Sequence, residues 1–121
     1  MPGLNSTADS AAVPFDPYEL KDVVGGTIKD PRRALWYFNS AANKGQSKAQ
    51  AVLGRMLFLG QPGIPRQAAR GLMWLALASS NATPSEAWIL EMYKAAYDQS
   101  NPEEHARAGE FLVQWVNGRR D

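Results

Sequence analysis

An internal repeat with an offset of 37 residues limits the fold of this chain more than any other sequence feature. Gly26 aligns with Gly63, and each glycine precedes a segment with matching small and aromatic positions. These positions are Ala34, Tyr37 and Ala41 in the first copy, and Gly71, Trp74 and Ala78 in the second. Fixed periods of roughly 20–50 residues are typical of architectures in which each unit buries its apolar face against the next. The chain is therefore predicted to be a repeat protein.

Start and stop signals divide the chain into helices. Asp30 is a good N-cap before proline, and a glycine at position 45 suits the end of that helix. Thr83 and Asn101 each precede a glutamate three residues later, which is the pattern of a capping box. We expect helices at about 31–43, 47–60, 67–79, 85–99 and 102–117, and a short helical turn at 18–24. No segment alternates as a strand does, so the chain is predicted to be all-α.

The length of 121 residues indicates one domain. Residues 1–17 are rich in Ser, Ala, Asn and Pro and are predicted to be a flexible arm. The segment lacks the charged and apolar regions of a signal peptide, although a trimmed, exported protein would also begin in this way. We expect a single repeat domain over 18–121, with repeats at about 25–60 and 61–97 and a capping helix at about 102–117.

Composition excludes several classes of site. The chain has no cysteine and one histidine, His105, so thiolate zinc sites, disulfides and paired-histidine mechanisms are excluded. The net charge is +1 and no basic block stands out, which argues against nucleic-acid binding. No apolar run approaches the ~20 residues of a membrane span. We therefore expect no cofactor, no metal and no membrane-spanning helix.

The repeat resembles the Sel-one-like repeats, a tetratricopeptide-related class of α-solenoid modules. The resemblance covers about 25–79. It rests on a pattern of residues along the chain: an alanine, a Leu-Gly pair, paired glycines, an aspartate, an alanine, an aromatic residue, an Ala-Ala pair and a glycine. The stretch "AQAVLGRMLFLG" and the loop after it carry Ala49, Leu53, Gly54, Leu57, Gly60 and Gly63; the stretch upstream carries Gly26, Asp30, Ala34, Tyr37, Ala41, Ala42 and Gly45. The resemblance implies a short right-handed α-solenoid of stacked antiparallel helix pairs with a C-terminal capping helix.

The chain departs from the family pattern at several positions. Gln67 stands where the second copy would carry aspartate. Glu91 and Lys94 replace the equivalents of Gly54 and Leu57. The helix at 85–99 is therefore a degenerate repeat, as expected of an end unit whose outer face contacts water.

The loop "GQPGIPRQ" at 60–67 invites a phosphate-binding interpretation, because it leads into a helix N-terminus. It matches neither GxxxxGK[ST] nor GxGxxG, and no strand precedes it. Its two prolines also remove N–H donors. The loop is predicted to turn a corner between stacked helices, with Gly71 as a packing residue of the helix that follows.

The charged side chains also have structural explanations. Glu86 and Glu104 occupy cap positions, and Glu103 suits the N-terminal end of a helix dipole. His105 has no positioned partner in the sequence and is predicted to be a surface residue. The scattered basic residues are predicted to form a solvated face; a mildly positive face that suits an acidic partner segment is the alternative. A carboxylate pair for glycan hydrolysis stays open as the alternative.

The resemblance implies a non-catalytic adaptor or regulator, of a kind frequent in bacterial signalling and cell-envelope contexts. It also implies that the first helix of each pair lines a concave surface that binds a partner protein. The predicted binding residues are Gln50, Arg55, Phe58, Trp88, Glu91, Tyr93 and Trp36. A cell-envelope glycan-acting enzyme and a structural self-assembly module stay open as alternatives. The location stays open as well: periplasmic or secreted if a leader was removed, otherwise cytoplasmic.

Overall fold

A computed structural model describes residues 31–118 of the chain, and the structural statements below concern this range. Its elements are α3 (Pro31–Asn43), α4 (Ser47–Leu59), α5 (Ala68–Asn81), the 3-10 turn η1 (Pro84–Glu86), α6 (Ala87–Asp98) and α7 (Pro102–Gly118). The described part contains no strand, so the all-α prediction is confirmed. The predicted arm at 1–17, the turn at 18–24 and the Asp30 cap lie outside the described residues.

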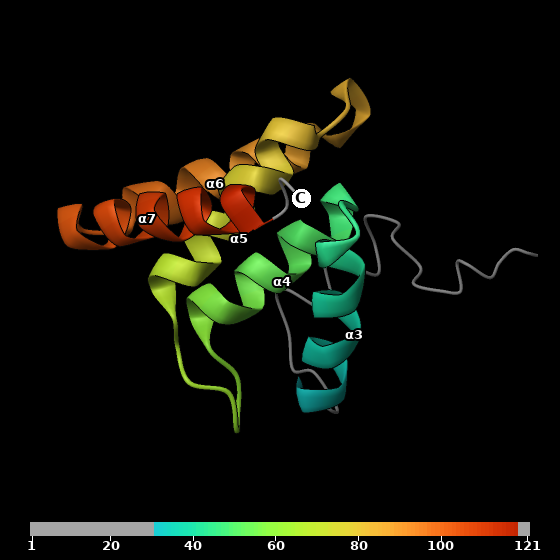
Figure 1. The fold of residues 1–121 in the computed structure, drawn as a ribbon, viewed down its shortest axis with the longest axis horizontal. Coiled ribbons are helices and arrows are strands. Elements are labelled where there is room, and N and C mark those ends of the chain that lie inside the picture. Colours follow the sequence, from blue (N-terminus) through green and yellow to red (C-terminus); the bar gives the residue numbers. More distant parts are fainter. Residues whose placement is uncertain (1–30, 119–121) are drawn as a thin grey trace, which may run out of the picture.

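The helices form a short α-solenoid around a central pair (Figure 1). α4 and α5 make the most extensive contact, and the extended loop at 60–67 joins them at one end. α3 packs against α4, whereas α6 and α7 both pack against α5. α7 therefore lies along α5 more closely than along α6, the helix before it in the sequence.

Two apolar clusters form the core, and both use α4 and α5. The first joins α3 to the central pair and contains Phe38, Met56 and Trp74. The second joins α6 to the same pair and contains Leu75 and Ile89. Full burial of each large apolar side chain contributes about 1.5–3 kcal/mol. α4 and α5 are thus apolar on two faces because each packs against the other and against two further helices.

α4 and α5 approach backbone to backbone at a pair of glycines. A Cβ atom built on Gly71 would lie 2.6 Å from the carbonyl oxygen of Gly54 and 2.6 Å from the backbone nitrogen of Phe58. A Cβ on Gly54 would lie 2.8 Å from the carbonyl oxygen of Gly71. Real Cβ atoms essentially never come so close to backbone atoms. The packing role predicted for Gly71 is confirmed, and Gly54 is its partner.

The glycine loop between α4 and α5 uses its own backbone donors. Gln61 and Ile64 exchange backbone hydrogen bonds of 2.8 and 2.7 Å, and Gln67 donates to the carbonyl of Leu57 at 2.7 Å. Gly60 and Gly63 adopt positive φ, which glycine accepts without strain. The side chain of Ile64 is buried in the first cluster. These bonds support the prediction of a structural corner.

The capping box predicted at Thr83 is confirmed, and it also connects two repeats. The Glu86 carboxylate accepts hydrogen bonds from the Thr83 backbone N–H and from the Ser47 hydroxyl, both at 3.0 Å. Ser47 begins α4, so one carboxylate ties the start of α4 to the start of α6. Glu86 is buried, which strengthens both bonds.

We expect Glu86→Ala to lower the free energy of unfolding by about 1–2 kcal/mol, because it leaves two part-buried donors without an acceptor. Urea unfolding followed by circular dichroism measures this change. Glu86→Gln retains an oxygen acceptor and is the matched control, with a smaller loss. Equal losses in both variants would contradict the role given to these hydrogen bonds.

The aromatic position of the repeat is filled differently in the two copies. Trp74 is buried in the second copy, but its equivalent Tyr37 is exposed, and Phe38 is the buried aromatic of α3. The buried aromatic of the first copy therefore lies one residue later than the repeat alignment places it. α3 has α4 as its only extensive neighbour within the described range, whereas α5 lies among three helices. A helix with one neighbour buries a narrower face.

Candidate functional site

A groove of about 700 Å³ is the largest hollow described here, and it lies between α3, α5 and α7. α4 forms its floor through Leu53 and Leu57. α3 contributes Trp36 on one wall, and α5 contributes Trp74. We call this hollow the α3–α5–α7 groove. Its volume lies within the range of about 300–1,000 Å³ that is usual for ligand pockets.

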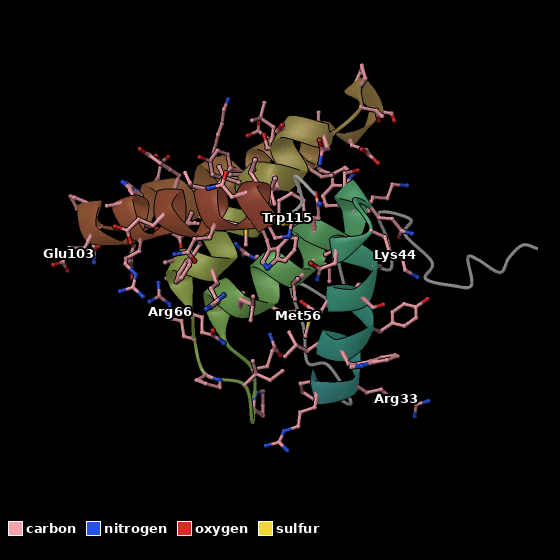
Figure 2. All side chains as sticks on the ribbon, in the orientation of Figure 1. Arg33, Lys44, Met56, Arg66, Glu103 and Trp115 are labelled. Carbon is pink, nitrogen blue, oxygen red and sulfur yellow. The ribbon has the colours of Figure 1, made fainter. Side chains whose placement is uncertain are left out.

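The C-terminal end of α7 closes one side of the groove. Trp115 reaches from α7 toward α3, where its indole N–H donates to the Asn43 side chain at 3.4 Å (Figure 2). The same ring meets Trp74 of α5 edge to face, with centroids 5.8 Å apart. Edge-to-face pairs are favourable because of the ring quadrupole. Trp115 therefore fixes α7 against both α3 and α5.

Trp36 is the most exposed large hydrophobic side chain of the described range. It is 72% exposed, although it lines the groove. Trp115 and Phe111 are only partly buried and line the same groove from α7. Partly exposed aromatic side chains from two helices thus face one hollow. Such rings are the residue type enriched among binding anchors.

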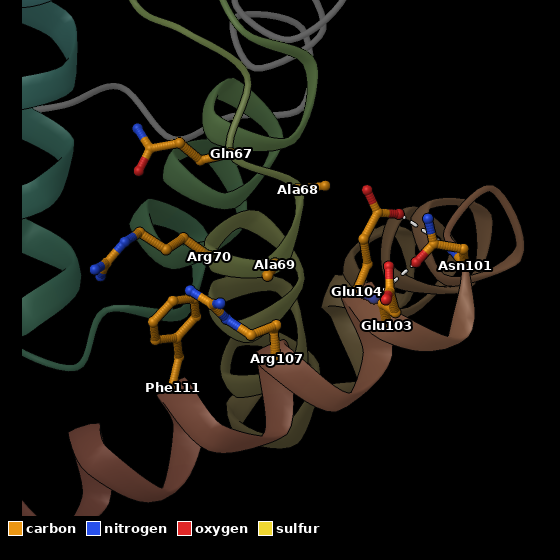
Figure 3. A pocket seen from close by; sticks show the side chains of 9 residues that line it. All are labelled: Gln67, Ala68, Ala69, Arg70, Asn101, Glu103, Glu104, Arg107 and Phe111. Atoms are coloured by element: carbon orange, nitrogen blue, oxygen red, sulfur yellow. Dashed lines mark hydrogen bonds between the residues drawn. The ribbon is translucent and has the colours of Figure 1, made fainter.

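A second hollow, of about 450 Å³, lies where the first turns of α5 and α7 come together (Figure 3). Gln67, Arg70 and Phe111 line both this hollow and the groove, so the two are continuous. Glu103 and Arg107 complete the outer part of the hollow. An extended segment lying in the groove can therefore continue into the hollow.

Arginine side chains lie over an aromatic ring where the two hollows meet. The guanidinium groups of Arg70 and Arg107 lie 4.3 and 5.2 Å from the centroid of Phe111 (Figure 3). Cation–π contacts of this kind contribute about 0.5–1 kcal/mol at exposed sites. They hold the two cations beside the groove.

The second predicted capping box is confirmed at the start of α7. The Asn101 side chain accepts from the Glu104 N–H at 2.8 Å, and the Glu104 carboxylate accepts from the Asn101 N–H at 3.1 Å. The same carboxylate pairs with Arg66 at 3.4 Å. Arg66 is half exposed, so this ion pair adds little stability.

Two of the predicted binding residues are buried, and the prediction is corrected for them. Gln50 has no exposed surface: its side-chain N–H donates to the Ala42 carbonyl at 3.1 Å, and its oxygen accepts from Asn81 at 3.3 Å. Phe58 is 2% exposed and lies in the second apolar cluster. Both side chains lie on faces of α4 that neighbouring helices cover. Neither is available to a partner on the surface.

The other predicted residues do not gather in one place. Trp88 and Tyr93 are partly buried and pack against the core, whereas Glu91 is exposed on α6. Arg55 is partly buried, and its Nε atom has no hydrogen-bond partner within the described range. Trp36 is the one member of the predicted set that lines the groove.

The single histidine lies beside a small cavity of about 130 Å³ between α5, α6 and α7. Its ring stacks on Tyr97 with centroids 3.8 Å apart, and Nε2 lies 2.9 Å from the Tyr97 carbonyl oxygen. His105 is partly buried, so it is a packing residue of the α6–α7 junction more than a free surface side chain. Burial, together with the neighbouring Tyr97, raises the pKa of Tyr93 in the same cavity.

Side chains of the types that bind metal ions are not clustered within the described range. No group of three or more His, Cys, Asp or Glu residues is placed to hold a metal ion there. Glu86 and Glu104 take the capping roles predicted for them. The groove itself is lined by aromatic, aliphatic, amide and arginine side chains.

Sequence reasoning missed the contribution of α7 to the groove. Phe111, Gln114 and Trp115 line it, although α7 was expected only to cap the solenoid. Their spacing of three to four residues on one helix face was the available signal. That spacing does not show whether a face is covered or lines an open hollow.

Comparison with known proteins gives one family. The family model described as Sel1 repeat matches residues 23–46 and 47–82. The second match spans α4 and α5, the central pair of the fold. No curated protein and no solved structure matches the chain. Within the described range, no helix has the length and apolar character needed to cross a membrane.

Proposed function

The chain belongs to the Sel1 repeat family, whose repeats are generally protein-interaction modules, and from this premise we propose that it binds a partner segment in the α3–α5–α7 groove. The groove replaces the surface of α4 and α6 residues expected from the sequence. In this proposal the protein is a non-catalytic adaptor. The engagement of Glu86 and Glu104 in capping supports that conclusion.

The observation that carries the proposal is the exposure of Trp36 within an aromatic groove. A 72% exposed tryptophan gives a large apolar area that a partner would remove from water. Trp115 lines the same groove. Anchors of this kind contribute most of the binding energy at protein interfaces.

Self-association is the second candidate, and exposed valines on α7 favour it. Val113 and Val116 are 59% and 45% exposed on a helix that has no fully buried residue. The end unit of a solenoid needs a polar outer face for solubility, so exposed apolar residues on that face favour association. Light scattering over a range of concentrations tests this candidate, and Val113→Glu would abolish oligomers formed through this face.

Selection of peptides from a random display library on the full chain tests the proposed function. Binding of each selected peptide to Trp36→Ala is then measured by fluorescence anisotropy. We expect a loss of about tenfold or more, because hot-spot truncations lose ≥ ~2 kcal/mol. Val113→Ala removes apolar area outside the groove and is the matched control, with affinity unchanged.

Selected peptides that bind Trp36→Ala as tightly as the unaltered chain would contradict binding in the groove. A selection that yields no binding peptide would contradict the adaptor function itself. Thermal unfolding of the variant confirms that the fold is kept, as expected for an exposed side chain.

A further inference from the structure

We infer that the occupant of the groove is an acidic segment of a partner protein, with carboxylates beside an apolar anchor; this inference rests on the function proposed above. The inference rests on the positive charge of the side chains that line the groove. Arg32 and Arg70 line the groove from α3 and α5, and no aspartate or glutamate among residues 31–118 lines it. A hollow with one sign of charge attracts a ligand of the opposite sign.

These arginines are not neutralised within the described range. The ion pair found there joins Arg66 to Glu104, outside the groove lining. Arg32, Arg70 and Arg107 have no carboxylate within the 4.0 Å of an ion pair among the described residues. No carboxylate of residues 31–118 therefore competes with a partner's carboxylates for these cations.

The arginines are also partly positioned in advance. Arg70 and Arg107 rest on the ring of Phe111, which restricts their rotamers before any ligand arrives. A guanidinium group binds a carboxylate through two parallel hydrogen bonds, and a prepositioned group loses less entropy on binding. Acidic residues at the far end of the hollow, Glu103 among them, disfavour further carboxylates there.

The geometry therefore assigns two parts to the ligand. An aromatic or aliphatic anchor lies over Leu53 and Leu57, beside Trp36 and Trp115. Aspartate or glutamate residues flank the anchor and meet Arg32 and Arg70. The contact is electrostatic at its edges, so the affinity falls as ionic strength rises.

Parallel peptide selections on three forms of the full chain test this inference. The forms are the unaltered chain, the double variant Arg32→Glu/Arg70→Glu, and the control Lys44→Glu/Lys94→Glu. Both doubles change the net charge equally, but Lys44 and Lys94 are exposed residues outside the groove lining. We expect acidic peptides with an apolar centre from the unaltered chain and the control. Reversal of the arginines should weaken those peptides about tenfold and enrich basic peptides instead.

The outcomes separate the inference from the function on which it rests. If the unaltered chain selects neutral or basic peptides whose binding requires Trp36, the inference of an acidic ligand is overturned. Binding in the groove would still be supported. Equal weakening by both double variants would also overturn it, because net charge alone would then explain the effect. Failure to select any peptide, or indifference to Trp36→Ala, would overturn the proposed function.

Discussion

Gly71→Leu is expected to lower the free energy of unfolding by at least about 3 kcal/mol and to leave much of the chain unfolded at 37 °C. Overpacking commonly costs about 1–3 kcal/mol, and here the obstacle is backbone. The first added carbon already meets the Gly54 carbonyl and the Phe58 nitrogen at 2.6 Å. α4 and α5 must separate to admit it, which opens both apolar clusters. Urea unfolding followed by circular dichroism measures the loss.

Gly109→Ala is the matched control for this prediction. Gly109 is an exposed glycine within α7, and beyond its chain neighbours and the local helix backbone nothing described lies within 4 Å of a Cβ built on it. Alanine there should stabilise the chain by about 0.5–1 kcal/mol, because glycine is the poorer helix former. Unchanged stability of Gly71→Leu would contradict the close approach of α4 and α5.

Phe58→Ala is expected to cost about 3–5 kcal/mol, the usual loss for a buried phenylalanine. Phe58 is 2% exposed in the second cluster, and Arg66 lies 5.0 Å from its ring centroid. The sequence placed this residue on a binding surface, whereas the structure places it in the core. Thermal and urea unfolding measure the change.

Trp36→Ala is the control for the stability loss predicted for Phe58→Ala. Trp36 belongs to the same predicted binding set but is 72% exposed, so its loss should change stability by no more than about 0.5 kcal/mol. A large loss for Trp36→Ala, or a small one for Phe58→Ala, would contradict the exposure of Trp36 and the burial of Phe58 in the structure.

The helices were predictable because their signals are local. Proline, glycine and the two capping boxes each act within a few residues, and α4 and α7 begin where the sequence predicts. The close packing of Gly71 was predictable for a different reason. A small residue repeated at one period in two copies indicates that helices touch there.

The binding surface was not predictable, because it depends on how helices far apart in the sequence come together. From the sequence, Gln50 is expected on the surface. In the structure its side chain is hydrogen-bonded to the carbonyl of Ala42 and to the side-chain amide of Asn81. The groove exists because α7 packs along α5 and reaches α3 through Trp115. No local pattern fixes the path of an end helix.

The indole N–H signals of the four tryptophans test the central claim most directly. Trp36, Trp74 and Trp115 line the groove, whereas Trp88 lies on α6 and does not. In a nitrogen–proton correlation spectrum of the full chain, assigned by single Trp→Phe variants, a selected peptide should shift the Trp36 and Trp115 signals and leave Trp88 in place. Shifts at Trp88 without shifts at Trp36 and Trp115 would contradict the groove.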